Sequence, residues 1–478
     1  MTEPGQSPLS RFIASFTQLR HCPRGLWFVL FAFVVESIAY FGMLTLMTTY
    51  LTADLGWGDG MASVTVSLFT MLVTLLMLGA GSYAEGFGLR RAIIFALVIS
   101  TGARFLYSYA GYSTSGWAVG AIVVVSLSAV ALGSAILQPV CYSGVKQYTD
   151  ENTNSMGYGL IYGFMNLGIV IIGGISAWAR PGVEAIHEAA ASGEPSSGGV
   201  LEPLAGVSSS GVQAVNWICT GITVLALVGF ALMMSRRAEA DKLRPDTAER
   251  DRGQRGPLGD RIRSYFREGP FTNKRFIFFI FMLLPVRTLF AHQWLTMPQY
   301  IIRAYPAGVG DKMEWLVNWI NPLVIFLFVP VLTALTRRLN VYRVMMIGSL
   351  ISAAPTFLLA FGPDLGLLIT YFVIFSLGEA LWSARFLEYA SELAPEGRLA
   401  QYMGLAQIPW LMAKGTTGFY SGYMLATYCP EGVPAEQLQT GTMWLWYAFI
   451  AMLSPLGLWL ARHWVMAGLG PAAGGTKS

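Results

Sequence analysis

The sequence predicts an all-α integral membrane protein with twelve transmembrane helices arranged in two six-helix bundles. The first observation is composition: 54% of the 478 residues are hydrophobic and only 12% are charged, whereas roughly 25% are charged in a typical soluble domain. So little charge cannot cover a water-soluble globule of this size. The second observation is that the apolar residues form twelve stretches of about 20 residues, the length that crosses the hydrocarbon core as a helix.

The twelve stretches follow one another along the chain, mostly separated by short polar turns such as 56–59 and 362–364. The first six are predicted at 26–52, 61–84, 90–111, 117–142, 155–178 and 214–235. The second six are predicted at 274–302, 314–335, 341–361, 366–390, 402–427 and 441–465. The N-terminus lacks the charged, apolar and small-residue order of a cleaved signal peptide, so we expect the first span to be retained.

Two connections are longer, and their charge sets the predicted orientation. Residues 236–270 carry ten Lys or Arg against seven acids, whereas 180–213 carry almost no positive charge. Basic connections face the cytoplasm, and the short loops that contain Lys146, Arg343 and Arg398 fall on the same side as 236–270. We therefore expect a multi-pass protein of the cell (inner) membrane, with both termini in the cytoplasm and 180–213 outside.

This order divides the chain into four parts. They are an N-terminal bundle at 1–235, a basic cytoplasmic linker at 236–270, a C-terminal bundle at 271–465 and a flexible tail at 466–478. Two bundles with a site between them near the middle of the membrane are typical of secondary transporters. A channel, a membrane enzyme or a scaffold with twelve spans can be divided in the same way.

Other classes of function find little support in the sequence. The net charge is only +4, which argues against a nucleic-acid surface. The four cysteines lie far apart and show no metal-ligand spacing. We find no Gly-rich phosphate loop between a strand and a helix and no nucleophile elbow. We therefore predict no catalytic residue, no metal site and no cofactor, and we do not expect an enzyme.

The loop after the second span carries the first motif. Gly81, Glu85 and Gly88 are followed by Arg90 and Arg91, which resembles the Gly-x-x-x-Asp-x-x-Gly-x-Arg-Arg signature of the major facilitator superfamily. The resemblance implies the major facilitator superfamily fold. Glycines allow two helices to approach, and an acid opposite arginines can form a breakable cytoplasmic gate. The alternative is a tight turn followed by ordinary cytoplasmic arginines.

Five further stretches resemble the proton-dependent oligopeptide transporter family, in the same order, between about 30 and 430. They are Glu36 to Met43, Gln138-Pro139, Tyr162 to Gly168, Asn321-Pro322-Leu323, and Gly378-Glu379 followed by Leu387 to Pro395. The resemblance implies that Asn166, Asn321 and Glu379 recognise the amino end of a peptide-like substrate. It also implies that Tyr40 and Tyr162 contribute to the substrate pocket.

The sequence departs from the family at its cations. The first-span motif has Phe33 and Ser37 where the family has Glu and Arg, and Gln138 stands where the family has Lys. No Asp or Glu occurs between 274 and 303, where relatives carry an acid. The resemblance therefore implies an amine-recognising pocket and leaves carboxylate recognition open.

Several ionisable residues fall inside predicted spans, where each costs on the order of 3 kcal/mol by insertion scales and therefore suggests a function. They are Glu36, Arg104, Arg287, His292, Glu379, Arg385, Glu388 and Lys414. Arg287 and Lys414 are the deep cations that a substrate carboxylate could meet. Arg385 and Glu388 are three residues apart near the cytoplasmic end, which favours a gating or structural pair. Arg104 lies near a helix end, where it can snorkel to the interface. The alternative for the deep charges is a permanent structural network.

Two residues are candidates for proton coupling. Glu36 keeps the acid of the first-span motif but has Ser37 in place of the adjacent Arg, so we expect it to be buried without its cation and to hold a proton. His292 can exchange a proton near neutral pH and is the second candidate. The alternative is that Arg287 or Lys414 keeps Glu36 ionised.

The sequence thus predicts a secondary active transporter that moves small, amine-bearing, peptide-like solutes by alternating access, coupled to protons. Its partners are the solute, protons and the lipid bilayer, with no nucleic acid, and we expect a monomer. The alternatives are a family member with a non-peptide substrate, an uncoupled or exporting transporter, and a non-transporting receptor or scaffold.

Overall fold

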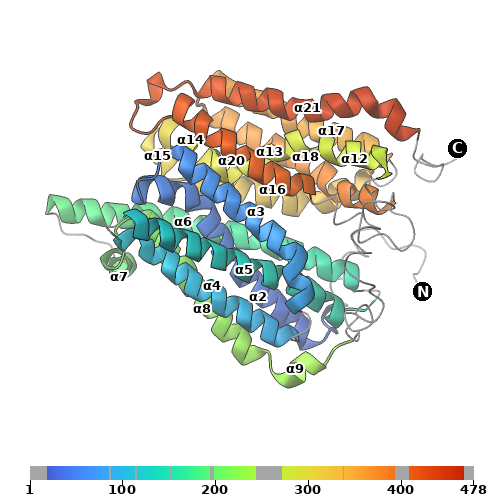
Figure 1. Ribbon diagram of the computed structural model, residues 1–478, viewed down its shortest axis with the longest axis horizontal. Coiled ribbons are helices and arrows are strands. Elements are labelled where there is room, and N and C mark those ends of the chain that lie inside the picture. The colour runs from blue at the N-terminus through green and yellow to red at the C-terminus, as the bar shows by residue number, and fades with distance from the viewer. Residues whose placement is uncertain are drawn as a thin grey trace. The chain divides into compact units, whose positions relative to one another are not determined.

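The structure is a computed structural model of the chain, and it describes residues 19–84, 88–113, 116–150, 153–193, 199–243, 272–336, 339–392 and 408–467. Every regular element in these ranges is helical (Figure 1). Each of the twelve predicted spans coincides with a helix or with consecutive helices. Residues 402–407 of the eleventh predicted span lie outside the described residues.

The first six spans correspond to helices of the expected length. They are α2 (Arg24–Thr49), continued by the π-helix η1 (Tyr50–Asp54), then α3 (Asp59–Ala84), α4 (Leu89–Tyr109), α5 (Gly116–Tyr148), α6 (Asn154–Ser192) and α8 (Gly211–Met233). Short helices α7 (Glu202–Gly206) and α9 (Arg236–Ala240) lie on either side of α8 in the sequence.

The second six spans also correspond to helices. They are α12 (Lys274–Met282), α13 (Leu284–Leu295) and α14 (Met297–Ala304) for the seventh span, then α16 (Met313–Thr336), α17 (Val341–Ala353) with the 3₁₀ helix η6 (Ala354–Phe361), α18 (Leu365–Glu392), α20 (Ile408–Tyr428) and α21 (Thr440–Met466). Within the described ranges, ten helices are long and apolar enough to cross a membrane, and Met313–Val329 of α16 forms a shorter apolar stretch.

The seventh span is broken twice, which the hydropathy pattern did not predict. Breaks fall at Leu283 and Thr296, and each is followed by a proline, Pro285 or Pro298, in the first turn of the next helix. Proline has no N–H group, so it is tolerated only where that group needs no helical partner. The two prolines therefore lie where the helix of this span is interrupted.

Helix α6 extends beyond the predicted span 155–178. It continues through Pro181 to Ser192, so the first part of the expected connection 180–213 is helical. Its 39 residues give a length of roughly 58 Å, about twice the thickness of the hydrocarbon core. His187 of this extension contacts the carbonyl oxygen of Ala205 at 3.0 Å through Nε2, which ties the extension to α7.

The chain divides into two compact units that do not follow the predicted boundary between bundles. Unit 1 comprises residues 1–43, 72–172 and 213–254, and unit 2 comprises 44–71, 173–212 and 255–478. Segments 44–71 and 173–212 belong to the first six spans in sequence but to unit 2 by packing. The division into bundles at 1–235 and 271–465 therefore stays a prediction.

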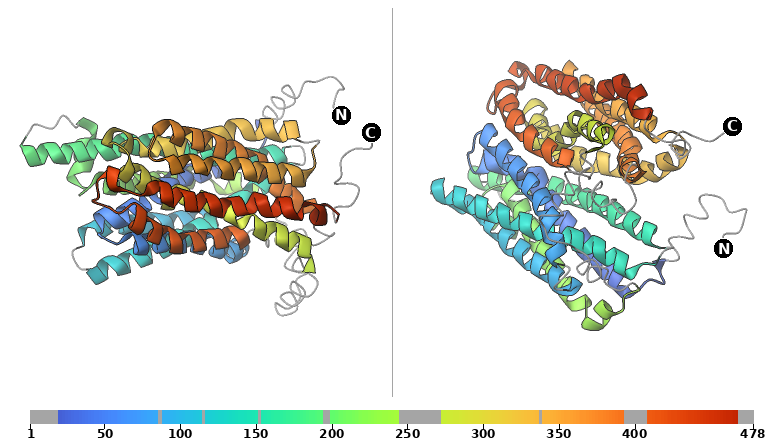
Figure 2. Two further views of the ribbon diagram at one scale, coloured as in Figure 1. Left: turned by 90° about the horizontal axis from the view of Figure 1, so that it is seen from above. Right: turned by 45° about the vertical axis from the view of Figure 1, so that its right-hand side comes forward.

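Unit 1 is built around α2, α4, α5 and α8. Helices α4 and α5 lie side by side (Figure 2). The buried side chains between these helices include Val29 of α2, Ile93 of α4, Val140 of α5 and Phe230 of α8. Because lipid is as apolar as these side chains, close packing rather than the hydrophobic effect holds the helices together.

In unit 2, α17 packs against both α18 and α21 (Figure 1). Helices α17 and α18 approach each other closely at two glycines. A Cβ atom at Gly378 would collide with the backbone nitrogen of Ser352, and a Cβ at Gly348 would lie 3.1 Å from the carbonyl oxygen of Gly378. Small residues allow this backbone approach, which positions the neighbouring Glu379.

We predict that Gly378→Ala lowers the free energy of unfolding by about 1–3 kcal/mol, because the added methyl group forces two helix backbones apart. The matched control is Gly102→Ala in α4, where a Cβ has nothing within 4 Å. That control should be neutral or stabilising by up to about 1 kcal/mol, since Ala is the better helix former. Thermal unfolding of the purified variants in detergent measures both, and similar losses in the two variants would contradict the packing argument.

Candidate functional site

Asn321 of α16 and Glu379 of α18 form a hydrogen-bonded pair in unit 2. The Nδ2 group of Asn321 donates to Glu379 Oε2 at 2.7 Å and to Ser376 Oγ at 3.0 Å. Both Asn321 and Glu379 are half-buried. Glu379 therefore has a neutral partner that orients its carboxylate, and the arrangement can accept hydrogen bonds from a cationic group.

Arg287 of α13 and Lys414 of α20 meet at one aromatic ring. The Arg287 guanidinium lies 5.9 Å from the centre of the Trp410 ring, and Lys414 Nζ lies 5.4 Å from the same centre. Arg287 also lies over Phe386 at 4.2 Å and near Trp382 at 5.6 Å. Cations over aromatic faces are stabilised by the charge distribution of the ring, so these aromatic side chains help to hold both cations in this part of unit 2.

Both ring nitrogens of His292 contact hydroxyl groups. Its Nδ1 lies 2.7 Å from Thr296 Oγ1 and its Nε2 lies 3.0 Å from the Tyr420 hydroxyl. The imidazole is fully buried and stacks on Tyr447 with 3.9 Å between ring centres. His292 lies one turn before Thr296, the residue that separates α13 from α14.

Glu36 is not buried without a cation, so that sequence-based expectation is wrong. Arg104 of α4 binds it in bidentate fashion, with Nη1 donating to Oε2 and Nη2 to Oε1, both at 2.7 Å. Nη1 also donates to Thr223 Oγ1 of α8 at 2.6 Å. Arg104 is 1% exposed and therefore does not snorkel. This network connects α2, α4 and α8 of unit 1. Arg104 is the cation beside Glu36, where the family motif would have an Arg in place of Ser37.

The remaining residues implied by the family resemblance lie in unit 1. Tyr40 is half-buried and contacts Phe41, whereas Tyr162 is 38% exposed. Asn166 is buried and its Nδ2 donates to the carbonyl oxygen of Tyr162 at 3.0 Å. Their role in a substrate pocket stays a prediction.

The predicted gating residues are described only in part. Arg90 donates through its backbone nitrogen to Glu239 of α9 at 3.0 Å and through Nε to the Met234 carbonyl oxygen. Arg91 is exposed. Arg385 is buried and donates to Thr336 Oγ1 at 3.3 Å. Glu85 and the side chain of Glu388 lie outside the described residues, so the two gating pairs stay predictions.

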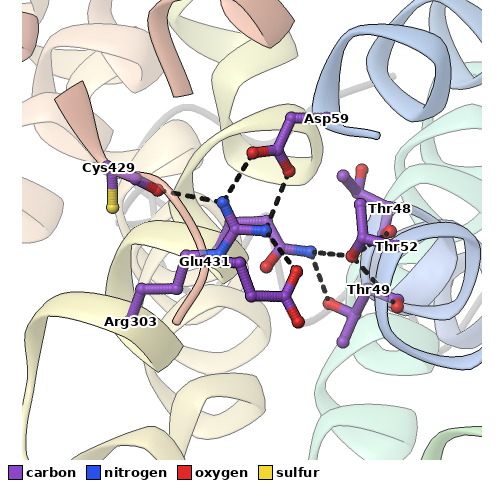
Figure 3. Close-up of polar contacts among 8 residues, drawn as sticks. Thr48, Thr49, Thr52, Asp59, Arg303, Cys429 and Glu431 are labelled. Carbon is purple, nitrogen blue, oxygen red and sulfur yellow. Dashed lines mark hydrogen bonds and ion pairs between the residues drawn. The ribbon is translucent and has the colours of Figure 1, made fainter. Parts of the chain in front are cut away.

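Unit 2 contains a further charge network that the sequence did not indicate. Arg303 of α14 donates to both carboxylate oxygens of Asp59 at 2.8 Å, to the Cys429 carbonyl oxygen at 2.9 Å and to Glu431 at 3.1 Å. Figure 3 shows these three groups around the guanidinium. Burial alone lowers the pKa of an arginine, but the hydrogen bonds and charge of Asp59 outweigh it and leave the pKa of Arg303 raised.

A neutral contact and a second ion pair accompany this network. Gln299 Nε2 donates to Thr52 Oγ1 at 3.1 Å and approaches Thr49 Oγ1 at 3.4 Å. Figure 3 shows both threonines beside the Arg303 network. Arg180 of α6 binds Glu314 of α16 through Nε at 2.6 Å and through Nη2 at 3.1 Å, with Glu314 fully buried. All these contacts join helix ends that the predicted topology places outside.

No sequence signal distinguished Asp59, Arg180, Arg303, Glu314 and Glu431. They lie at the ends of predicted spans, where charged residues are ordinary. Only the packing of helix ends within unit 2 shows which of them meet.

The sequence pattern of the Major Facilitator Superfamily matches residues 29–413 of the chain. A shorter match joins the chain to "Peptide transporter family 1" of Drosophila melanogaster, with 33% identity over 119 residues. It covers 24% of this chain and 16% of the length of the fly protein.

Solved structures of the same fold cover nearly the whole chain. A peptide transporter, POT, in complex with sulfate has a TM-score of 0.69 and 16% identity, over 93% of this chain and 95% of that one. A POT family transporter in complex with 5-aminolevulinic acid has a TM-score of 0.63 and 16% identity, over 93% and 97%. A bacterial homologue of the human drug peptide transporters PepT1 and PepT2 has a TM-score of 0.66 and 15% identity, over 93% and 98%. At these identities the likeness shows the fold, and the predicted all-α fold is confirmed.

We predict that Arg303→Gln lowers the free energy of unfolding by about 3 kcal/mol, because it leaves Asp59 buried without its cation. The side chains of Arg303 and Asp59 are 6% and 8% exposed. Glu431→Gln is the matched control, because the Glu431 side chain is 58% exposed and an exposed pair contributes less than about 1 kcal/mol. Equilibrium unfolding in detergent compares the two, and an equal loss would contradict the dominant role of Asp59.

Proposed function

The chain belongs to the Major Facilitator Superfamily and is a multi-pass membrane transporter, and we propose that it carries small zwitterionic, peptide-like solutes by alternating access. Similar structures are those of peptide transporters, one of them in complex with 5-aminolevulinic acid, a molecule with an amine and a carboxylate. These relatives support a solute with both charges. The family transports solutes, so the protein is not an enzyme.

One observation carries the proposal: unit 2 presents an acid and two cations on neighbouring helix faces. Glu379 and Trp382 are three residues apart on α18 and therefore share a face, and Trp382 contacts Arg287. Lys414 joins Arg287 at Trp410. An ammonium group removed from water needs an anion and hydrogen-bond acceptors, and a carboxylate needs a cation. We assign the amine end of the solute to Glu379 and Asn321 and the carboxylate end to Arg287 and Lys414.

This assignment also accounts for the departures from the family motif. Ser37 and Gln138 replace the cations that the resemblance associates with the carboxylate end and with coupling. Arg287 and Lys414 offer the same chemistry from the second half of the chain. We retain Tyr40, Tyr162 and Asn166 as proposed pocket residues on the strength of their motif positions.

We further propose that transport is coupled to protons through Glu36, with His292 as a second station. A proton on Glu36 removes the charge that Arg104 binds, so it loosens the contact among α2, α4 and α8. The second candidate is an uncoupled facilitator. In that candidate the bidentate pair of Glu36 with Arg104 is a permanent structural contact.

We predict that Glu379→Gln weakens binding of a dipeptide by about tenfold or more, because a hydrogen bond to a charged group is lost. Binding of the N-acetylated dipeptide should not change, since it has no ammonium group. Arg287→Lys should weaken binding of the dipeptide but not binding of the dipeptide amidated at its C-terminus, because Lys cannot form a planar bidentate contact with a carboxylate. Ligand-induced stabilisation of purified protein measures each affinity. Equal losses for the blocked and unblocked ligands would contradict the assignment.

We predict that an imposed proton gradient drives solute accumulation by wild-type protein in sealed vesicles and that Glu36→Gln abolishes accumulation while retaining exchange of solute. Glu36→Gln removes the carboxylate but keeps the side-chain size. Arg104→Gln is the companion variant, and it should weaken the dependence on pH by releasing Glu36 from its cation. Absence of gradient-driven accumulation in the wild type would favour the uncoupled facilitator.

A further inference from the structure

Polar side chains follow the facing sides of α4 and α8 in unit 1, starting at the end of α8 that the predicted topology places outside. On each helix they recur three or four residues apart and therefore share one face. Each is at most 6% exposed. We call them the α4–α8 polar cluster, which comprises Gln213, Asn216, Thr220 and Thr223 of α8 and Arg104 and Ser108 of α4.

Hydrogen bonds join the two helices along this cluster. Gln213 Nε2 donates to the Ser108 carbonyl oxygen at 2.9 Å, and Thr220 Oγ1 lies 3.2 Å from Ser108 Oγ. One turn further along α4 toward its N-terminus, Arg104 Nη1 donates to Thr223 Oγ1 at 2.6 Å. The α4–α8 polar cluster therefore leads from the outer end of α8 to the guanidinium that binds the first-span carboxylate.

Two members of the cluster are buried with hydrogen-bonding atoms that no described group satisfies. Asn216 is 3% exposed and has no partner for Oδ1 or Nδ2, and Arg104 has none for Nε. Ser100, one turn before Arg104 on α4, is fully buried, and its Oγ also has no partner within the described ranges. Buried polar groups nearly always have partners, and ordered water supplies those that protein atoms do not. A side-chain amide offers both a donor and an acceptor, which water can use.

Aromatic side chains mark where the cluster meets the membrane surface. Trp217, next to Asn216, donates through Nε1 to the Tyr112 hydroxyl at 3.1 Å and packs against Phe105 with 5.3 Å between ring centres. Phe105 and Tyr112 are 54% and 41% exposed. Trp and Tyr are enriched at the boundary between lipid and water. The Gln213 end of the cluster therefore lies near water on the side that the predicted topology places outside.

We propose that the α4–α8 polar cluster binds ordered water at Asn216 and at Arg104 Nε, and that this water carries a proton from the outer side to Glu36 through unit 1 alone. The proposal rests on the proton coupling proposed above and adds its route. Each water molecule accepts a proton from one neighbour and releases a proton to the next. One proton taken from the outer solution thus ends on the Glu36 carboxylate as a neutral carboxylic acid.

Four titratable groups interact electrostatically with Glu36 in the described part of unit 1, one from each of four helices. They are Tyr40 of α2, Arg104 of α4, Cys141 of α5 and Cys219 of α8. Phenols and thiols are ordinarily neutral at pH 7, so Arg104 is the charged group among these four. A proton that reaches Glu36 therefore acts on the ion pair with Arg104, which joins α2 and α4.

The first test detects the water directly. Hydroxyl radicals produced by X-ray pulses oxidise a buried side chain where a water molecule lies beside it. Tyr107 is three residues after Arg104 on the same face of α4 and is 1% exposed. Tyr342 is the matched control, because it is also 1% exposed and its hydroxyl donates to the Leu458 carbonyl oxygen at 2.6 Å. We expect mass spectrometry of the irradiated full chain to show oxidation of Tyr107 severalfold faster than that of Tyr342.

Two variants test the role of Asn216. Asn216→Leu removes both hydrogen-bonding atoms at similar size and should lower the oxidation of Tyr107 to the level of Tyr342. Asn216→Ser keeps a hydroxyl and leaves room for water, so it should retain the oxidation. In sealed vesicles, Asn216→Leu should slow gradient-driven uptake severalfold and leave the exchange of labelled solute unchanged, because exchange needs no net proton transfer.

Four outcomes would contradict the proposal, and each rejects a different part of it. If Tyr107 of the wild type is as protected as Tyr342, the cluster is dry and the proposal is wrong, whatever drives transport. If Asn216→Leu keeps the oxidation of Tyr107, water does not bind at Asn216, and the site is rejected.

The remaining two outcomes concern transport. An equal slowing of uptake and exchange in Asn216→Leu shows a structural role and rejects the proton route, while the proposed function stands. If Tyr107 is oxidised but no proton gradient drives accumulation by the wild type, the water site stands, and the proposed coupling is wrong together with its route.

Discussion

Charged side chains between membrane helices have no bulk water to solvate them, so each must find its partner within the protein. In unit 1, Arg104 and Glu36 satisfy this requirement across α4 and α2. In unit 2, Arg180 pairs with Glu314, and Arg303 pairs with Asp59. Each pair joins helices that are distant in the sequence. Because a buried charge must be neutralised, these ion pairs are tertiary contacts that determine which helices can pack together.

Glu379, to which we assign the amine end of the solute, has a neutral partner instead. Glu379 is oriented by the neutral amide of Asn321, and the contacts described for Arg287 are with aromatic rings. Neutral and aromatic contacts fix a charged group in position without cancelling its charge. A neutral partner leaves the carboxylate of Glu379 able to accept a cationic group, which is the role that we propose for it.

The first span shows how a motif residue can be replaced from another helix. The family motif places its Arg next to the acid, and this chain has Ser37 there. Considered along the sequence, Glu36 therefore lacks a cation. In three dimensions Arg104, 68 residues away, binds it in bidentate fashion. A sequence motif describes residues that are neighbours along one helix. The cation that a buried acid needs can come from any helix that packs against it.

The sequence alone predicted the all-helical membrane class, because crossing a bilayer requires about 20 apolar residues in a self-satisfied helix, and its motifs predicted the superfamily. Ten of the predicted spans are helices long and apolar enough to cross a membrane in the described part of the chain. It also singled out Glu379, Arg287 and Lys414 as candidate site residues, since charged residues within apolar spans are rare and costly, and the family resemblance added Asn321. Only the tertiary structure decided how charges pair, where the seventh span breaks and which segments pack together. Arg303 and Asp59 are 244 residues apart. Periodicity places a residue on a face of its own helix, but a contact between helices depends on how side chains of both helices fit together, and no single helix encodes that fit.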